Sequence, residues 1–198
     1  MKKLSHKFFS RNTIQVAKEL LGKYLVLKTP KGKLIGKIVE TEAYHEKDPA
    51  SHSYRGMTPR NKPMFGKPGF AYVYFTYGMH YCFNVVTEPS GKAGAVLIRA
   101  VEPIKGIEQM KKNRTPRQAR DKNKMGLKNL TNGPAKLAQA FGIDKKFNEA
   151  DLAKGKLNIF IDGKNDHKIA KTKRIGISVA EHALLRFYIK GNKFVSVK

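Results

Sequence analysis

An acidic and aromatic strand end is the feature of this sequence best suited to chemistry. Glu40, Glu42 and Tyr44 occupy every second position of an apolar run that ends at Tyr44, so an extended strand would place their side chains on one face. The Pro- and Gly-rich segment His45–Gly69 follows directly. Paired carboxylates beside a long loop favour general acid–base catalysis, although a solvent-exposed acidic strand face would give the same pattern.

The charge of the whole chain favours the catalytic interpretation. The 198 residues include 40 Lys and Arg against 15 Asp and Glu, which gives a formal net charge of +25. Such an excess predicts a polyanionic partner, and nucleic acid is the default one, although a surplus of Lys also serves general solvation. Glu88 is the only acidic residue between residues 49 and 101. Glu42 would therefore lie in a positively charged region that attracts DNA. A carboxylate that faces DNA repels phosphate, and acid–base chemistry would supply a reason for its presence.

A second strand, Phe70–Tyr77, is rich in aromatic residues and ends at a turn. Most strands of this kind contribute their aromatic side chains to a core. Tyr77, however, directly precedes Gly78, and a Tyr at a hairpin tip is badly placed for a core but well placed to insert between DNA bases.

Two polar residues interrupt the apolar strands that follow. Asn84 is either a buried Asn satisfied by the backbone or a residue that reads the edge of a base. Arg99 is the only charged residue in Ala93–Val101. An unpaired buried Arg is costly, so Arg99 must pair or face a site, and Glu40 or Glu42 would be a natural partner.

Other chemistries lack their sequence patterns. The single cysteine, Cys82, permits neither an intramolecular disulfide nor a multi-cysteine zinc site. No phosphate-binding loop and no helical His pair with metal-ligand spacing is present. The sequence also has no apolar run long enough for a membrane span and no signal peptide. We therefore expect no cofactor, no metal and no membrane partner, and a cytoplasmic location.

The elements that must position these residues predict an α+β fold. We expect one domain over residues 1–198, with a mixed, mostly antiparallel, curved β-sheet flanked by helices and a β-hairpin that projects toward DNA. The expected helices are Asn12–Leu21, Ile104–Lys112 and Gly133–Phe141, the last with Asn132 as its cap. The expected strands are Tyr24–Leu27, Leu34–Tyr44, Phe70–Tyr77, Tyr81–Thr87, Ala93–Val101, Leu157–Ile161, Arg174–Ser178, Arg186–Lys190 and Phe194–Val197.

Two basic segments are candidates for contacts with DNA. Lys105–Lys128 holds nine basic and two acidic residues without apolar periodicity, which is typical of a flexible basic loop. The run Asn132–Lys136 opens a helix, whose free N–H groups could hold a phosphate together with Lys136. A plain capped helix would give the same pattern.

Taken together, these residues resemble the alkyladenine (methylpurine) type of 3-methyladenine DNA glycosylase, in its compact bacterial form. Their joint order and spacing from about Phe8 to Ser196 carry the resemblance more than any single motif does. The matching blocks are Val39–Tyr44, His52-Ser53, Thr58–Asn61, Met64-Phe65, Lys67–Gly69, Tyr72–Tyr74, Tyr77–Met79, Asn84, Leu97–Ala100, Glu102-Pro103, Gly133–Leu137 and Leu185–Tyr188.

The resemblance implies a role for each matching residue of the reaction site. Glu42 would be the general base that activates the attacking water, and Arg99 would position the water and the target nucleotide. Tyr44, His52 and Tyr74 would form the walls around a base flipped out of the duplex. The loop between Tyr44 and His52 is one residue shorter than in the mammalian relatives, which also have a long N-terminal extension that this sequence lacks.

The resemblance implies further roles in binding DNA. Tyr77 would fill the gap that the flipped base leaves, and Asn84 would clash with the 2-amino group of guanine. Arg60 lies in a matching block and, with Lys136, is assigned to DNA binding.

The expected function is that of a monofunctional glycosylase that excises alkylated or deaminated purines and leaves an abasic site. The expected partner is double-stranded DNA containing damaged purines, bound by a monomer associated with a bacterial nucleoid. Two alternatives stay open. The charge alone would also suit a non-catalytic DNA- or RNA-binding protein, and the many Lys residues leave room for a lyase that forms a Schiff base.

Overall fold

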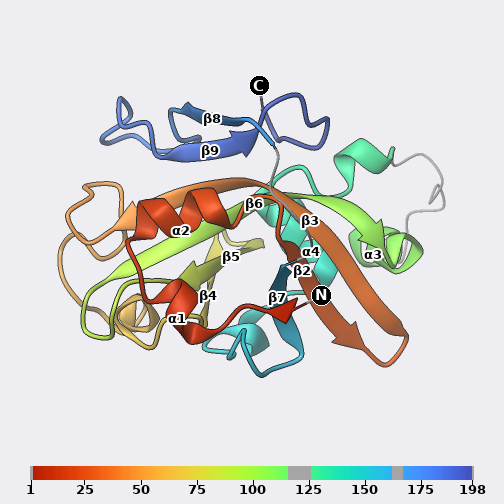
Figure 1. Ribbon diagram of the computed structural model, residues 1–198, viewed down its shortest axis with the longest axis horizontal. Helices are drawn as coiled ribbons and strands as arrows, with labels where there is room; N and C mark the ends of the chain where they lie inside the picture. The colour runs from red at the N-terminus through yellow and green to blue at the C-terminus, as the bar shows by residue number, and fades with distance from the viewer. Residues whose placement is uncertain (1, 116–125, 162–166, 198) are drawn as a thin grey trace.

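Within the part of the chain that the structure describes, one nine-stranded β-sheet carries short helices against it (Figure 1). The computed structural model describes residues 2–115, 126–161 and 167–197. Its strands are β1 (Lys2–Lys3), β2 (Tyr24–Thr29), β3 (Gly32–His45), β4 (Ala71–Thr76), β5 (His80–Val86), β6 (Gly94–Lys105), β7 (Leu157–Ile161), β8 (Ile169–Thr172) and β9 (Arg186–Ile189). Its α-helices are α1 (His6–Phe9), α2 (Thr13–Glu19), α3 (Ile107–Arg114) and α4 (Pro134–Phe141), and its 3-10 helices are Lys62–Phe65, Leu127–Asn129 and Lys145–Phe147.

The expected α+β fold is confirmed, and the sheet is more uniform than the expected mixed one. The main strand order is β1-β7-β2-β3-β6-β5-β4, with β9 on β3 and β8 on β9. Every strand pairing within the described ranges is antiparallel. The meander β4-β5-β6 follows the chain order, as its short turns predict.

Strand β3 is the element that carries the acidic residues into the middle of the sheet. Its first half pairs with β2, and its second half lies between β6 and β9. The β3–β6 register shifts on both sides of Glu40, and such irregularities re-aim side chains. The side chains of Glu40 and Glu42 are both fully buried. The solvent-exposed acidic face that the sequence left open is therefore excluded.

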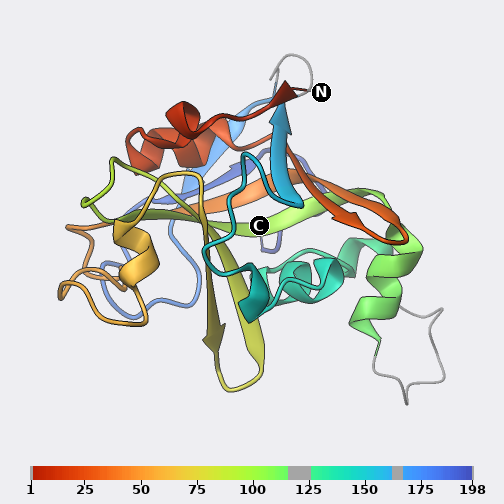
Figure 2. The same cartoon turned by 90° about the horizontal axis from the view of Figure 1, so that it is seen from below.

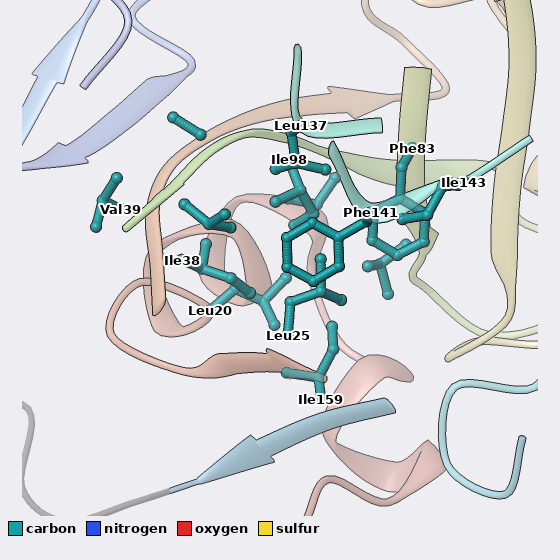
Figure 3. Packing of buried hydrophobic residues seen from close by; sticks show 14 of the residues in the cluster. Leu20, Leu25, Ile38, Val39, Phe83, Ile98, Leu137, Phe141, Ile143 and Ile159 are labelled. Carbon is teal, nitrogen blue, oxygen red and sulfur yellow. The ribbon is translucent and has the colours of Figure 1, made fainter. Parts of the chain in front are cut away.

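Helix α4 packs its apolar face against the sheet. Leu137 and Phe141 contribute to one cluster with Ile38 and Ile98 (Figure 3). The helix ends at Phe141, and its C-cap Gly142 has a left-handed φ of 67°, which a glycine can adopt without strain. This core holds the strands that carry the acidic and aromatic residues in fixed register.

The β4–β5 hairpin extends away from the rest of the molecule (Figure 2). At its tip both Tyr77 (φ 51°) and Gly78 (φ 65°) have left-handed backbone conformations, which are uncommon for a bulky residue. The Tyr77 side chain is 81% exposed. The tip therefore presents an aromatic ring to solvent, as the turn signal predicts.

Two expected strands and one expected helix cap are wrong. Arg174–Ser178 and Phe194–Val197 are not strands, because the N–H groups of Ile175 and Ser196 donate to carboxylates of β3 instead of to a neighbouring strand. Asn132 does not cap α4, since Gly133 is the N-cap residue and the Asn132 side chain accepts from Lys136.

The basic segment Lys105–Lys128 differs from the expected loop at its two ends. It begins at the end of β6, continues through helix α3, and ends inside the short helix Leu127–Asn129. Helix α3 thus starts three residues later than expected and runs to Arg114. Residues 116–125, with Arg117 and Arg120, lie outside the described residues.

Candidate active site

A cavity of about 570 Å³ lies where β3, β4, β5 and β6 meet the segment 175–179. It gathers residues that are far apart in the sequence. Of the residues expected to form the site, those that line it are Glu42, Tyr44, His52, Tyr74, Tyr77, Asn84 and Arg99. Arg60 and Lys136 are not among its lining residues.

Glu42 is held by three donors at the wall of this cavity. The Tyr44 hydroxyl donates to Oε2 at 2.8 Å, and the Ile175 backbone N–H donates to Oε1 at 2.9 Å. Arg99 Nη1 lies 3.2 Å from Oε1. These contacts fix a fully buried carboxylate against a chamber lined largely by uncharged residues, and charge-assisted hydrogen bonds of this kind are the strong ones. The arrangement suits a base that must accept a proton at one defined position.

Glu40 has a different environment although it lies only two residues away. Its Oε1 accepts from Arg99 Nε (3.2 Å), Arg186 Nε (2.8 Å) and Ser196 Oγ (2.8 Å). Its Oε2 accepts from the Ser196 backbone N–H at 2.7 Å. Glu40 does not line the cavity. Its carboxylate is therefore committed to internal pairing, which anchors the C-terminal segment to β3.

Arg99 bridges the two carboxylates, as its isolation in an apolar strand predicts. Burial alone would lower the pKa of its guanidinium, but Glu42 and Glu40 raise that pKa by more. The side chain is therefore a permanent cation placed between two carboxylates.

Aromatic rings form another part of the cavity wall. The rings of His52 and Tyr74 are 4.6 Å apart between centroids, with their planes at 72°. The His52 Nδ1 atom lies 2.9 Å from the Tyr72 hydroxyl. Burial, and then the positive charge of Arg60, lower the pKa of His52, so this ring is neutral at pH 7. Burial also raises the pKa of Tyr72 to about 12.

Asn84 combines the two interpretations that the sequence left open. It is 3% exposed, and its side-chain nitrogen donates to the Tyr72 carbonyl at 3.0 Å. It also lines the cavity. The backbone contact fixes the amide in place, so the same residue can present a rigid edge to whatever occupies the chamber.

Of the residues expected to contact DNA, Tyr77 lines the cavity and Arg60 contacts the lining residue Tyr74, whereas Lys136 pairs with Asn132. Tyr77 is on its rim, at the hairpin tip. The Arg60 guanidinium lies over the Tyr74 ring at 5.6 Å and donates to the Phe75 carbonyl at 3.3 Å. The Lys136 ammonium donates to Asn132 Oδ1 at 2.9 Å, and burial followed by the charge of Arg114 lowers its pKa.

The sequence reasoning missed Asp48 and Arg174. Both are buried, and they form a two-pronged ion pair, with Arg174 Nη2 at 2.9 Å from Asp48 Oδ1 and Nη1 bonded to Oδ2. Arg174 Nη1 also donates to the Ala43 carbonyl, and its guanidinium lies 4.7 Å from the centre of the Tyr44 ring. Composition alone could have indicated these two residues. Arg174 is one of few Arg residues in a Lys-rich chain, and Asp48 is one of two acidic residues in the segment His45–Gly69.

Neither a membrane-spanning helix nor a metal-binding cluster is found in the residues that the structure describes. No helix there is long and apolar enough to cross a membrane. Nor do those ranges hold a cluster of three or more His, Cys, Asp or Glu side chains that could bind a metal ion.

Comparison with known proteins identifies the family. The family model described as methylpurine-DNA glycosylase matches residues 7–193. A protein of Carboxydothermus hydrogenoformans is 52% identical over 197 residues, covering 98% of this chain and 99% of its own. Proteins of Desulfitobacterium hafniense and Francisella tularensis are 47% and 52% identical, covering 100% and 94% of both chains respectively. All three carry the name "Putative 3-methyladenine DNA glycosylase". The expected resemblance is confirmed: the chain belongs to the methylpurine-DNA glycosylase family of DNA repair hydrolases.

Proposed function

We propose that this protein is a monofunctional 3-methyladenine DNA glycosylase that flips alkylated or deaminated purines out of duplex DNA and hydrolyses their N-glycosidic bond. The product would be DNA with an abasic site, and the enzyme would act as a monomer. The observation that carries the proposal is the buried Glu42 carboxylate on the wall of an aromatic cavity. A carboxylate so placed reaches a base only after the base has left the duplex.

Extrusion of the base is assigned to the hairpin. Unstacking a nucleotide costs a few kcal/mol, and a side chain that fills the vacated space offsets part of that cost. Tyr77 is suited to this task, because its ring is exposed at a projecting tip and also borders the cavity. The wedge and the receiving chamber are therefore adjacent.

Recognition of the base is assigned to the cavity walls. Tyr44, Tyr74 and the neutral ring of His52 offer aromatic surfaces for a purine. Asn84 is fixed against the backbone and would clash with the 2-amino group of guanine. A cavity of about 570 Å³ is within the size range of small-molecule sites.

Hydrolysis is assigned to a water molecule activated by Glu42. As the C1′–N bond breaks, its electron pair leaves with the purine, and the water oxygen bonds to C1′ while Glu42 accepts the water proton. A purine methylated at N3 carries a positive charge and departs as a neutral base, so it needs no proton donor. Arg99 holds Glu42 in place and balances its charge before the proton arrives.

Contact with the DNA backbone is assigned to the basic residues. Arg60 is exposed beside the cavity, and Lys136 lies in the first turn of α4. The other Lys and Arg residues would add diffuse attraction without sequence information.

The test is release of the free base from a duplex containing 3-methyladenine, measured in single turnovers with excess enzyme. The Glu42→Gln variant is expected to bind the damaged duplex and to release the base at least about 100-fold more slowly, the lower end of a general base's contribution. The exposed Glu181→Gln variant is the matched control and should behave as the wild type.

Each alternative function has its own outcome in this experiment. No release by the wild-type protein at any enzyme excess would favour a non-catalytic DNA-binding protein. Trapping of a protein–DNA adduct by borohydride would reveal a Schiff base and favour a lyase. Unchanged release by Glu42→Gln would reject the role of Glu42.

A further inference from the structure

Two arginines lie against the aromatic walls of the cavity. The Arg174 guanidinium carbon is 4.7 Å from the centre of the Tyr44 ring, and that of Arg60 is 5.6 Å from the centre of the Tyr74 ring. Both distances are within the range of a cation–π interaction. Both tyrosines line the cavity, but neither arginine does. Each ring therefore already interacts with a cation that lies outside the space where a base would bind.

The cation on Tyr44 is fixed. The Arg174 side chain is fully buried, and it is tied to Asp48 through both terminal nitrogens and to the Ala43 carbonyl. Water does not screen it, but the Asp48 carboxylate bonded to it offsets part of its charge at the ring. Arg60 is exposed, although its hydrogen bond to the Phe75 carbonyl holds it near Tyr74. Solvent weakens this second interaction without removing it.

The other charges near the cavity largely cancel. The anions Glu40 and Glu42 are balanced by the guanidinium groups of Arg99 and Arg186. The lowered pKa of His52 keeps that ring neutral. The faces of Tyr44 and Tyr74 are therefore the surfaces on which a preference for a positively charged base would depend.

We propose that Arg174 and Arg60 reduce the preference of this cavity for positively charged purines over neutral ones. An aromatic ring attracts a cation through the negative potential of its faces. A guanidinium on one face draws on that potential and repels a second cation on the other face. The site would then select bases by shape and stacking more than by charge. This inference rests on the proposed function, since it concerns the flipped base.

The experiment compares binding of two lesions that have one shape and different charge. One duplex carries 3-methyladenine, which is cationic, and the other carries 3-deaza-3-methyladenine, which is neutral. Both have a 2′-fluorine on the sugar to prevent cleavage. The measured quantity is the dissociation constant of the neutral duplex divided by that of the cationic duplex, because this ratio cancels effects on general DNA affinity.

Three variants and one control give the expected pattern. Arg60→Gln and Asp48→Asn/Arg174→Gln should each raise the ratio about threefold, because solvent screens the first cation and Asp48 offsets part of the charge of the second. The double variant leaves no buried charge unpaired. Arg174→Lys keeps the charge and should stay near the wild-type ratio. Arg55→Gln removes an exposed cation of the same loop and should leave the ratio unchanged.

The inference is overturned if Arg60→Gln and the double variant both stay within twofold of the wild-type ratio. If the double variant does not fold, the exposed Arg60 decides the outcome alone. A rise in Arg55→Gln equal to that in Arg60→Gln would also overturn it, because the effect would then be general. Failure of the wild-type protein to prefer either lesion over undamaged DNA would instead reject the proposed function, and the inference with it.

Discussion

Glu40 and Glu42 are two residues apart, yet the structure predicts that substitution of Glu40 lowers stability whereas substitution of Glu42 lowers base release. Glu40 accepts hydrogen bonds from Arg99, Arg186 and Ser196 and does not line the cavity. Replacing it by Gln removes the charge that balances Arg186, which is 5% exposed. Breaking a buried ion pair by removing one partner costs about 3–5 kcal/mol. We therefore expect Glu40→Gln to lower the free energy of unfolding by about 4 kcal/mol.

Glu42→Gln should cost much less stability, because Arg99 keeps its contact with Glu40. The amide oxygen of Gln can still accept a hydrogen bond from the Ile175 N–H or from the Tyr44 hydroxyl, so the loss is about 1 kcal/mol. For base release we expect the opposite order, with the larger loss in Glu42→Gln. Glu42→Gln should abolish most of it, and Glu40→Gln should retain it whenever the protein is folded.

The assay is urea unfolding followed by circular dichroism, together with single-turnover base release at a temperature where both variants are folded. A shift of the unfolding midpoint with an unchanged slope reports stability alone. For a chain of this length, 3 kcal/mol of difference corresponds to about 6–12 °C in Tm. Equal stability losses in the two variants, or equal losses of base release, would refute the distinction.

Three further predictions concern the hairpin, the cavity and the acid stability of the fold. Tyr77→Ala should weaken binding to lesion-containing DNA more than to undamaged DNA, and equal losses in a fluorescence titration would contradict a wedge. Asn84→Ser should increase release of guanine relative to 3-methyladenine, and chromatography of the free bases would detect it. Burial would raise the pKa of Glu88, but Lys92 and Thr13 hold it below its ordinary value of 4.5. Glu88 therefore stabilises the fold above about pH 4.5, and it loses this contribution as the pH falls through its folded-state pKa. The free energy of unfolding of Glu88→Gln should therefore decline less on acidification than that of the wild type.

Local spacing was sufficient to predict the parts of the site that lie within single elements. The alternation of Glu40, Glu42 and Tyr44 predicts one shared face, and the Tyr44 hydroxyl does reach Glu42. The Tyr77-Gly78 pair predicts the hairpin tip, which the positive φ angles confirm. Asn12 predicts the start of α2, where its side chain accepts from the N–H groups of Ile14 and Gln15. In each case the interacting groups are neighbours in the chain, so backbone geometry alone decides the contact.

The contacts that set the electrostatics of the site depend on tertiary structure. Asp48 and Arg174 are 126 residues apart, and the Ile175 N–H reaches Glu42 across 133 residues. No sequence pattern around Asp48 or around Arg174 and Ile175 indicates these partners. The segment Arg174–Ser178 is instead predicted as a strand. A buried charge takes whatever opposite charge the fold brings within reach, and donors from distant loops can replace strand partners.

The sequence by itself thus determined the family, the basic character and the residues offered for chemistry, because residue type and order are local properties. The tertiary structure decided that Glu42 faces the cavity while Glu40 is committed to internal ion pairs, and that arginines lie against the aromatic walls. The physical reason is that charge acts through space over a few ångströms, whereas the sequence orders residues only along the chain.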